Sequence, residues 1–156
     1  MNTLHQTILE NKHNNLSVFF TAGFPTLDST QEILGILNNT AVDFIEIGIP
    51  FSDPLADGPV IQHSSTVALN NGMTLELLFS QLKEIRNSVN KPYLLMGYLN
   101  SLLACGIEAF YRKCHEAGVK HDEMNEVFMI ANLVGGSIVI PHYRRAVEYW
   151  DELNEA

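Results

Sequence analysis

The sequence predicts an α/β layer fold built on a three-stranded parallel sheet. Three apolar runs rich in β-branched and aromatic residues indicate the strands: "LSVFFTAG" at residues 16–23, "VDFIEIGI" at 42–49 and "KPYLLMGY" at 91–98. Each run is followed by a segment whose apolar residues recur at helical spacing. Strands that alternate with helices favour right-handed parallel crossovers, so we expect the three strands to lie side by side in one sheet.

The helices around this sheet have their own start and stop signals. Ser29 is followed three residues later by Glu32, the capping-box pattern in which each side chain satisfies a free backbone N–H of the other residue. Gly118 is the expected C-cap of the last helix in this part of the chain. The helices expected from apolar periodicity and from these signals span residues 3–11, 29–37, 60–72, 74–89 and 106–118.

Beyond Val119 the pattern changes from strands and helices to helices only. Apolar residues recur at positions i, i+3, i+4 and i+7 up to the Gly135–Gly136 pair, which ends one expected helix, and Pro141 begins a second. We therefore expect two units: an α/β unit over residues 1–119 and a two-helix tail over residues 120–156.

The composition indicates a folded protein with a small molecule or another protein as its partner. Hydrophobic residues make up 46% of the chain and charged residues 17%, which suffices for a core of ordinary size. Eighteen acidic against nine basic residues give a net charge of −9, which argues against nucleic acid or an anionic membrane surface as a partner. No apolar run approaches the about 18 residues of a membrane span, and we expect a cytoplasmic protein.

The cysteines and histidines give no sign of a metal or a cofactor. Cys105 and Cys114 have a spacing that fits neither a metal knuckle nor a redox pair, so packed thiols in a reducing compartment are expected. The histidines do not form a pair at helical i, i+4 spacing with a carboxylate in register. We expect no metal and no cofactor; the histidines considered are His63, His115, His121 and His142.

Three carboxylates at the second strand are the candidate functional residues. Glu46 interrupts the apolar run of this strand, and Asp53 and Asp57 lie in the proline-rich loop after it. Parallel α/β folds place their active sites at the carboxyl ends of the strands, where these acids are expected. A structural role is an alternative: Glu46 could pair with a buried hydroxyl or N–H, and the two aspartates could cap their own backbone.

Three stretches of the first unit carry a resemblance to a known family. "FFTAGFPTLDST", "FIEIGIPFSDPLADGPVIQHSSTVAL" and "LLMGYLNSLLACGIEAFYRKCHEAGV" resemble the N-terminal part of the tryptophan synthase alpha chain, so that residues 1–119 are similar to its first strands and helices. The resemblance implies a partial, three-strand segment of a TIM (β/α)8 barrel. It also implies the family's reaction, the cleavage of indole-3-glycerol phosphate into indole and glyceraldehyde 3-phosphate.

The resemblance also implies roles for individual residues. Glu46 corresponds to the catalytic proton carrier, and Asp57 to the acid that holds the indole N–H and stabilises positive charge on the ring. Phe19 corresponds to a residue that lines the indole pocket. The loop around Asp53 corresponds to a surface that contacts the beta chain of tryptophan synthase.

The tail carries a second resemblance. "HDEMNEVFMIANLVGGSIVIPHYRRAVEYWDEL" is similar to the C-terminal helices of the carboxymuconolactone decarboxylase and alkyl hydroperoxidase D family, which implies an oligomer formed through residues 120–156. The thiol-active members carry a CxxC pair and a histidine where this chain has "LLACGIEAF", so the resemblance does not imply peroxidase chemistry. Taken together, the two resemblances predict a chimera.

Three functions follow as expectations. The first is an alpha-chain lyase segment without the phosphate-binding half of the barrel, inactive by itself because positioning of the substrate supplies roughly 7–11 kcal/mol of catalysis. The second is a module without enzymatic activity that binds a beta chain or associates with itself. The third is a protein similar to carboxymuconolactone decarboxylase.

Overall fold

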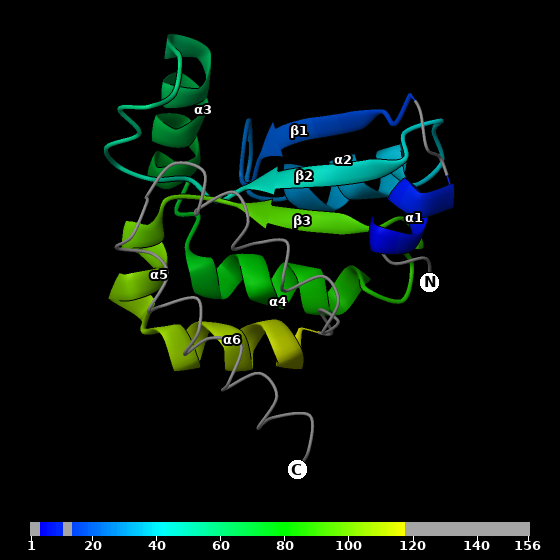
Figure 1. The fold of residues 1–156 in the computed structure, drawn as a ribbon. Helices are drawn as coiled ribbons and strands as arrows, with labels where there is room; N and C mark the ends of the chain where they lie inside the picture. The colour runs from blue at the N-terminus through cyan, green and yellow to red at the C-terminus, as the bar shows by residue number, and fades with distance from the viewer. Residues whose placement is uncertain (1–3, 11–13, 118–156) are drawn as a thin grey trace.

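The computed structural model describes residues 4–10 and 14–117, and this part of the chain is a parallel sheet with helices around it (Figure 1). Strands and helices alternate, as the sequence predicts. In chain order the elements are α1 (Leu4–Glu10), β1 (Ser17–Thr21), α2 (Ser29–Leu37), β2 (Phe44–Gly48), α3 (Pro59–Asn70), α4 (Leu75–Ile85), β3 (Tyr93–Met96), α5 (Leu99–Cys105) and α6 (Ile107–Glu116).

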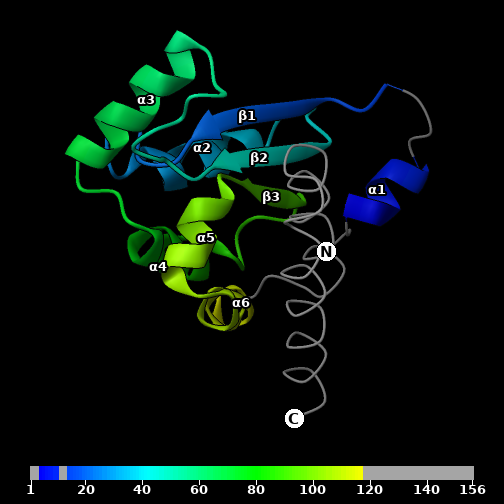
Figure 2. The same cartoon turned by 60° about the vertical axis from the view of Figure 1, so that its left-hand side comes forward.

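The sheet has the predicted strands in the order β1-β2-β3, and both pairings are parallel. The register places Phe19, Glu46 and Leu94 in one row across the three strands. All three strands point the same way, so their carboxyl ends meet at one edge. Figures 1 and 2 show α3 and α5 at this edge and α1 at the opposite one.

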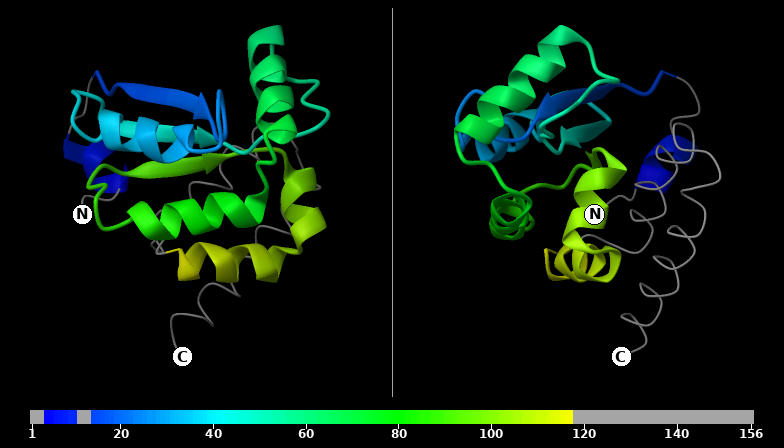
Figure 3. Two further views of the ribbon diagram at one scale, coloured as in Figure 1. Left: turned by 180° about the vertical axis from the view of Figure 1, so that it is seen from behind. Right: turned by 90° about the vertical axis from the view of Figure 1, so that its left-hand side faces the viewer.

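One face of the sheet forms the core. Ile45 and Ile47 of β2 are fully buried there, next to Leu95 of β3, and the helices α2 and α4 contribute Leu34 and Leu78 to the same cluster. In the right-hand view of Figure 3, α2 and α4 lie on one side of the sheet and α1 lies on the other. The parallel α/β prediction is therefore confirmed for the described residues.

The predicted capping box at the start of α2 is wrong. Asp28, and not Ser29, is the N-cap residue, and its carbonyl accepts the N–H groups of Gln31 and Glu32. The Ser29 hydroxyl lies 3.2 Å from the Thr26 nitrogen and 2.9 Å from the Thr26 hydroxyl. The turn before the helix leaves the Thr26 N–H without a helical partner, and Ser29 satisfies this donor instead of capping the helix.

The region after β3 contains a helix that periodicity did not predict. Helix α5 is seven residues long, too short for an apolar repeat to be visible, and Gly106 separates it from α6 with a φ of +87°. The predicted helix over 106–118 is confirmed as α6, whose C-cap is Ala117. The predicted cap at Gly118 and the two tail helices within 120–156 lie outside the described residues.

Among the described residues, every helix is too short or too polar to cross a membrane.

Removal of side-chain volume from the core face should destabilise the protein strongly. Ile47→Ala leaves a cavity beneath the sheet and should lower the free energy of unfolding by about 2–5 kcal/mol. Ile36→Ala is the matched control, because Ile36 on α2 is 65% exposed and its loss should change stability by about 0.5 kcal/mol or less. Urea denaturation measures both, and equal midpoints for the two variants would contradict the assignment of the core face.

Candidate active site

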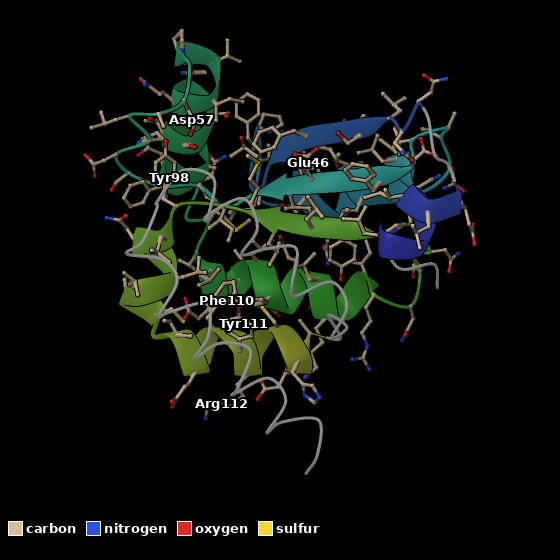
Figure 4. The ribbon with its side chains drawn as sticks, viewed as in Figure 1. Glu46, Asp57, Tyr98, Phe110, Tyr111 and Arg112 are labelled. Atoms are coloured by element: carbon tan, nitrogen blue, oxygen red, sulfur yellow. The ribbon has the colours of Figure 1, made fainter. Side chains whose placement is uncertain are left out.

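Glu46 lies on the face of the sheet that α2 and α4 leave uncovered. Side chains alternate along a strand, so the burial of Ile45 and Ile47 on one face turns Glu46 to the other. Figure 4 shows it in the middle of β2, two residues before the strand ends and not at its end as the sequence suggested. The side chain is half-buried, and within residues 4–10 and 14–117 it forms no hydrogen bond or ion pair. The alternative of a structural pairing partner therefore has no support in the described part of the chain.

Phe19 lies beside Glu46 in the register of β1 and β2. Its side chain is 36% exposed, and its ring packs over Gly48 at the carboxyl end of β2. A Cβ atom added to Gly48 would lie 2.5 Å from Cζ of Phe19, so the ring occupies the space that any other residue would fill. The structure thus brings an aromatic face and a carboxylate together on one side of the sheet.

The loop between β2 and α3 carries the two aspartates. Its backbone turns through carbonyl acceptors: Asp53 O accepts the Leu55 N–H at 2.8 Å, and Pro54 O accepts the Asp57 N–H at 3.0 Å. The Asp53 carboxylate is exposed and accepts a hydrogen bond from Ser52 Oγ. Among the described residues neither aspartate carboxylate accepts a backbone N–H. The two side chains therefore do not cap the turns of their own loop.

Contacts from α3 hold this loop against the end of the sheet. Thr21 Oγ1 and Ser64 Oγ lie 2.7 Å apart in a buried site, which joins the last residue of β1 to α3. Ser64 Oγ also donates to Ile61 O at 3.0 Å, so Thr21 is the donor in the pair. Gln62 Nε2 donates to the Asp57 carbonyl at 2.9 Å. The start of α3 is therefore fixed to both β1 and the Asp57 backbone.

Tyr98 is a site residue that the sequence reasoning missed. Its hydroxyl lies 3.1 Å from Asp57 Oδ2 and 3.0 Å from the Ala56 nitrogen, and Figure 4 shows Tyr98 and Asp57 close together beyond the strand ends. Its ring stacks on Phe51, with centroids 4.9 Å apart. Tyr98 comes two residues after β3 ends, and this position at the carboxyl edge of the sheet is the signal that could have identified it.

The described residues contain no group of three or more His, Cys, Asp or Glu side chains that could hold a metal ion. His63 and His115 are both exposed, while His121 and His142 lie outside this part of the chain. Cys114 is buried in the core and Cys105 is half-buried, and both are free thiols. Burial raises the pKa of the Cys114 thiol well above its ordinary value, which keeps it protonated and unreactive.

Comparison with known proteins identifies the family. The family model "Tryptophan synthase alpha chain" matches residues 5–123. The chain belongs to the tryptophan synthase alpha chain family. Over 119 residues it is 55% identical to the tryptophan synthase alpha chain of Christiangramia forsetii and 52% identical to that of Phocaeicola vulgatus, and each match covers 76% of this chain and 46% of the relative. The chain thus spans about half the length of the curated relatives it matches.

Solved structures of the family give the same result for the fold. The tryptophan synthase subunit alpha of Legionella pneumophila superposes with a TM-score of 0.67 at 30% sequence identity, covering 83% of this chain and 54% of that one. The three-stranded sheet and its helices therefore resemble part of the alpha-chain barrel.

The second resemblance finds no support. The alpha-chain model extends past Val119 to residue 123, into the segment predicted to begin a different family. No comparison supports the predicted similarity of residues 120–156 to carboxymuconolactone decarboxylase, an oligomer through those residues, or the description of the chain as a chimera. The apolar repeat of the tail is a pattern that many amphipathic helices share.

A side chain at position 48 should disturb the contact between Phe19 and β2. Gly48→Ala places a methyl group against the Phe19 ring and should lower the free energy of unfolding by about 1–3 kcal/mol. Gly35→Ala, in α2 with no atom within 4 Å of the added Cβ, should instead stabilise the protein by roughly 0.5–1 kcal/mol. Thermal unfolding compares the variants, and a Gly48→Ala protein as stable as Gly35→Ala would contradict the packing of Phe19.

Proposed function

We propose that this chain supplies the acid-bearing part of a tryptophan synthase alpha-chain active site, which cleaves indole-3-glycerol phosphate into indole and glyceraldehyde 3-phosphate. The observation that carries the proposal is the half-buried Glu46 carboxylate, which has no partner among the described residues and lies in register with Phe19. Membership of the alpha-chain family over residues 5–123 supports it.

The reaction requires a group that moves protons. Retro-aldol cleavage breaks the bond between the indole ring and the glycerol chain: a glycerol hydroxyl loses its proton as the carbonyl of the aldehyde forms, and the ring carbon gains a proton. In this proposal Glu46 carries these protons, because a carboxylate that no hydrogen-bond donor occupies is free to accept a proton from the substrate.

Asp57 and Phe19 bind the indole ring in this proposal. Oδ2 of Asp57 is held by Tyr98, while Oδ1 forms no hydrogen bond within the described residues and is available to the indole N–H. The negative charge of Asp57 stabilises the positive charge that develops on the ring when its carbon is protonated. The exposed side of the Phe19 ring offers an aromatic surface for the flat substrate.

Efficient turnover needs more strands than the described residues provide. (β/α)8 barrels commonly bind phosphate through the loops after strands seven and eight, and the described residues provide three strands. The substrate's phosphate end would then be held weakly, and positioning of a substrate accounts for roughly 7–11 kcal/mol of a barrier. We propose that the remaining part of an alpha chain, added as a second polypeptide, completes the site.

The decisive experiment measures indole release. The 156-residue chain is mixed with a polypeptide that carries the part of the Christiangramia forsetii alpha chain outside the match, and indole-3-glycerol phosphate is added. Glu46→Gln, which keeps the size of the side chain and removes its charge, should lower indole release about 100-fold or more relative to the unsubstituted chain.

The control for this variant is Glu32→Gln, an exposed glutamate on α2, which packs on the face of the sheet opposite Glu46; this variant should retain full activity. Each chain is also assayed without the second polypeptide and should then release little indole. Equal indole release from the Glu46→Gln and Glu32→Gln proteins would refute the lyase proposal.

The exposed loop after β2 favours a second function, the binding of a tryptophan synthase beta chain. Leu55 is 86% exposed and Val60 at the start of α3 is 76% exposed, with the exposed Asp53 carboxylate in the same segment. Exposed apolar side chains that gather in a patch rimmed by polar groups mark protein interaction sites. This function requires no turnover and is independent of Glu46.

A charge reversal tests this second function. Asp53→Lys should raise the Kd for the beta chain about tenfold, because it places a positive charge where the interface receives a negative one. Glu32→Lys, an equal charge change on α2, should leave the Kd unchanged. Sedimentation velocity with a purified beta chain measures both, and the same Kd for the two variants would exclude the loop as the docking site.

A further inference from the structure

Tyr98 connects the loop that carries Asp57 to the strand next to it. We propose that Tyr98 is a positioning residue for Asp57: its hydroxyl fixes Oδ2 and the loop backbone, so that Oδ1 is presented to the substrate. This role rests on the proposed function for its chemistry, while the contact itself can be tested without turnover.

The hydrogen bonds of the hydroxyl have a defined direction. The Ala56 N–H can only donate, so it occupies a lone pair of Tyr98 Oη at 3.0 Å. The hydroxyl has a single hydrogen, which is left for Asp57 Oδ2 at 3.1 Å. Tyr98 thus accepts from the residue before Asp57 and donates to Asp57 itself, which sets the carboxylate's rotation as well as its place.

The ring of Tyr98 is held by its surroundings. It stacks on Phe51, with centroids 4.9 Å apart and an interplanar angle of 25°, and Phe51 follows β2 as Tyr98 follows β3. The two strand ends are close: the Ile49 N–H donates to Met96 O at 2.7 Å, and a Cβ on Gly97 would lie 3.1 Å from Cβ of Ile49. The glycine allows this approach, and a side chain on a rigid base can position its partner more accurately than one on a mobile base.

The Tyr98 hydroxyl remains protonated at neutral pH, because its pKa is raised. Desolvation raises the pKa of Tyr98 above its ordinary value, the Ala56 N–H opposes this shift, and the hydrogen bond to Asp57 and its negative charge raise the pKa further. A raised phenol pKa favours the neutral, donating form up to a higher pH. Among the described residues Asp57 is the charged side chain that acts on this hydroxyl.

The first test measures the ionisation of Tyr98 in the 156-residue chain itself. The Cζ resonances of ¹³C-labelled tyrosines are followed through an alkaline titration, and Tyr98→Phe assigns the Tyr98 signal. Asp57→Asn removes the negative charge and should move the Tyr98 midpoint to lower pH, whereas Asp28→Asn, an exposed aspartate at the start of α2, should leave it unchanged. An identical Tyr98 midpoint in both variants would show that the contact is absent and would overturn the proposal.

The second test uses the chain completed by the second polypeptide. Tyr98→Phe keeps the ring and its stacking but removes the donor, and should lower kcat/KM about tenfold, as expected for a hydrogen bond to a charged group. In the Asp57→Asn background the same change should have no further effect. Tyr111→Phe, which removes a hydroxyl in the core of α6, is the control and should retain the activity.

The outcomes of the two tests separate the proposals. Independent, multiplicative losses from Tyr98→Phe and Asp57→Asn would show that Tyr98 does not act through Asp57 and would overturn the positioning role. If the unsubstituted, completed chain released no indole, the proposed function would fail, and the tyrosine titration would still decide whether Tyr98 holds Asp57.

Discussion

Ile45 and Ile47 of β2 are packed, without exposed surface, against the helical layer, and their burial determines which face of the sheet Glu46 occupies. Side chains of a strand alternate between its two faces, so residues between and after these isoleucines must turn to the opposite side. Those residues are Glu46 and Gly48. A shift of the strand by one residue would bury the Glu46 carboxylate among aliphatic side chains, which is costly for a charged group, and would expose the isoleucines. The core thus orients the acid.

The loop between β2 and α3 carries Asp53 and Asp57, and other groups of the loop and of α3 hold it in place. Backbone carbonyls of Asp53 and Pro54 make the turns, and side chains on other elements hold the loop: Ser64 through Thr21, and Gln62 through the Asp57 carbonyl. Because these contacts hold the loop, the carboxylate oxygens of Asp53 and Asp57 are not used by its backbone. A loop built on self-capping aspartates would have used the same oxygens for its own backbone.

Glu46 and Asp57 have different surroundings, which fits the different roles proposed for them. Glu46 sits on a strand inside the sheet, beside an aromatic ring and away from the hydrogen-bond donors of the described residues. Asp57 lies in a loop and has one oxygen fixed by a neighbouring strand's tyrosine. A group that exchanges protons benefits from the absence of a fixed donor, whereas a group that orients a ring benefits from being held.

The sequence by itself determined most of the elements, α5 excepted, and the residues that stand out in them. The three strands, the helix α4 with its repeat at Leu75, Leu78 and Leu82, and Glu46 as the exception in an apolar strand all follow from patterns within a few residues of each other. Local patterns of this kind can be recognised without knowledge of the fold. The predicted capping box at Ser29 was wrong because another contact was available nearby. The Ser29 hydroxyl hydrogen-bonds Thr26 in the preceding turn and does not cap the helix.

Tertiary structure decided which of these residues meet. The contact between Tyr98 and Asp57 joins positions 41 residues apart, and the packing of Phe19 on Gly48 depends on the register between β1 and β2. Neither leaves a trace in the local pattern, because each arises from two strands ending at one edge of the same sheet. That arrangement is set when the core face is buried, and only then does a tyrosine after the third strand become a neighbour of an aspartate after the second.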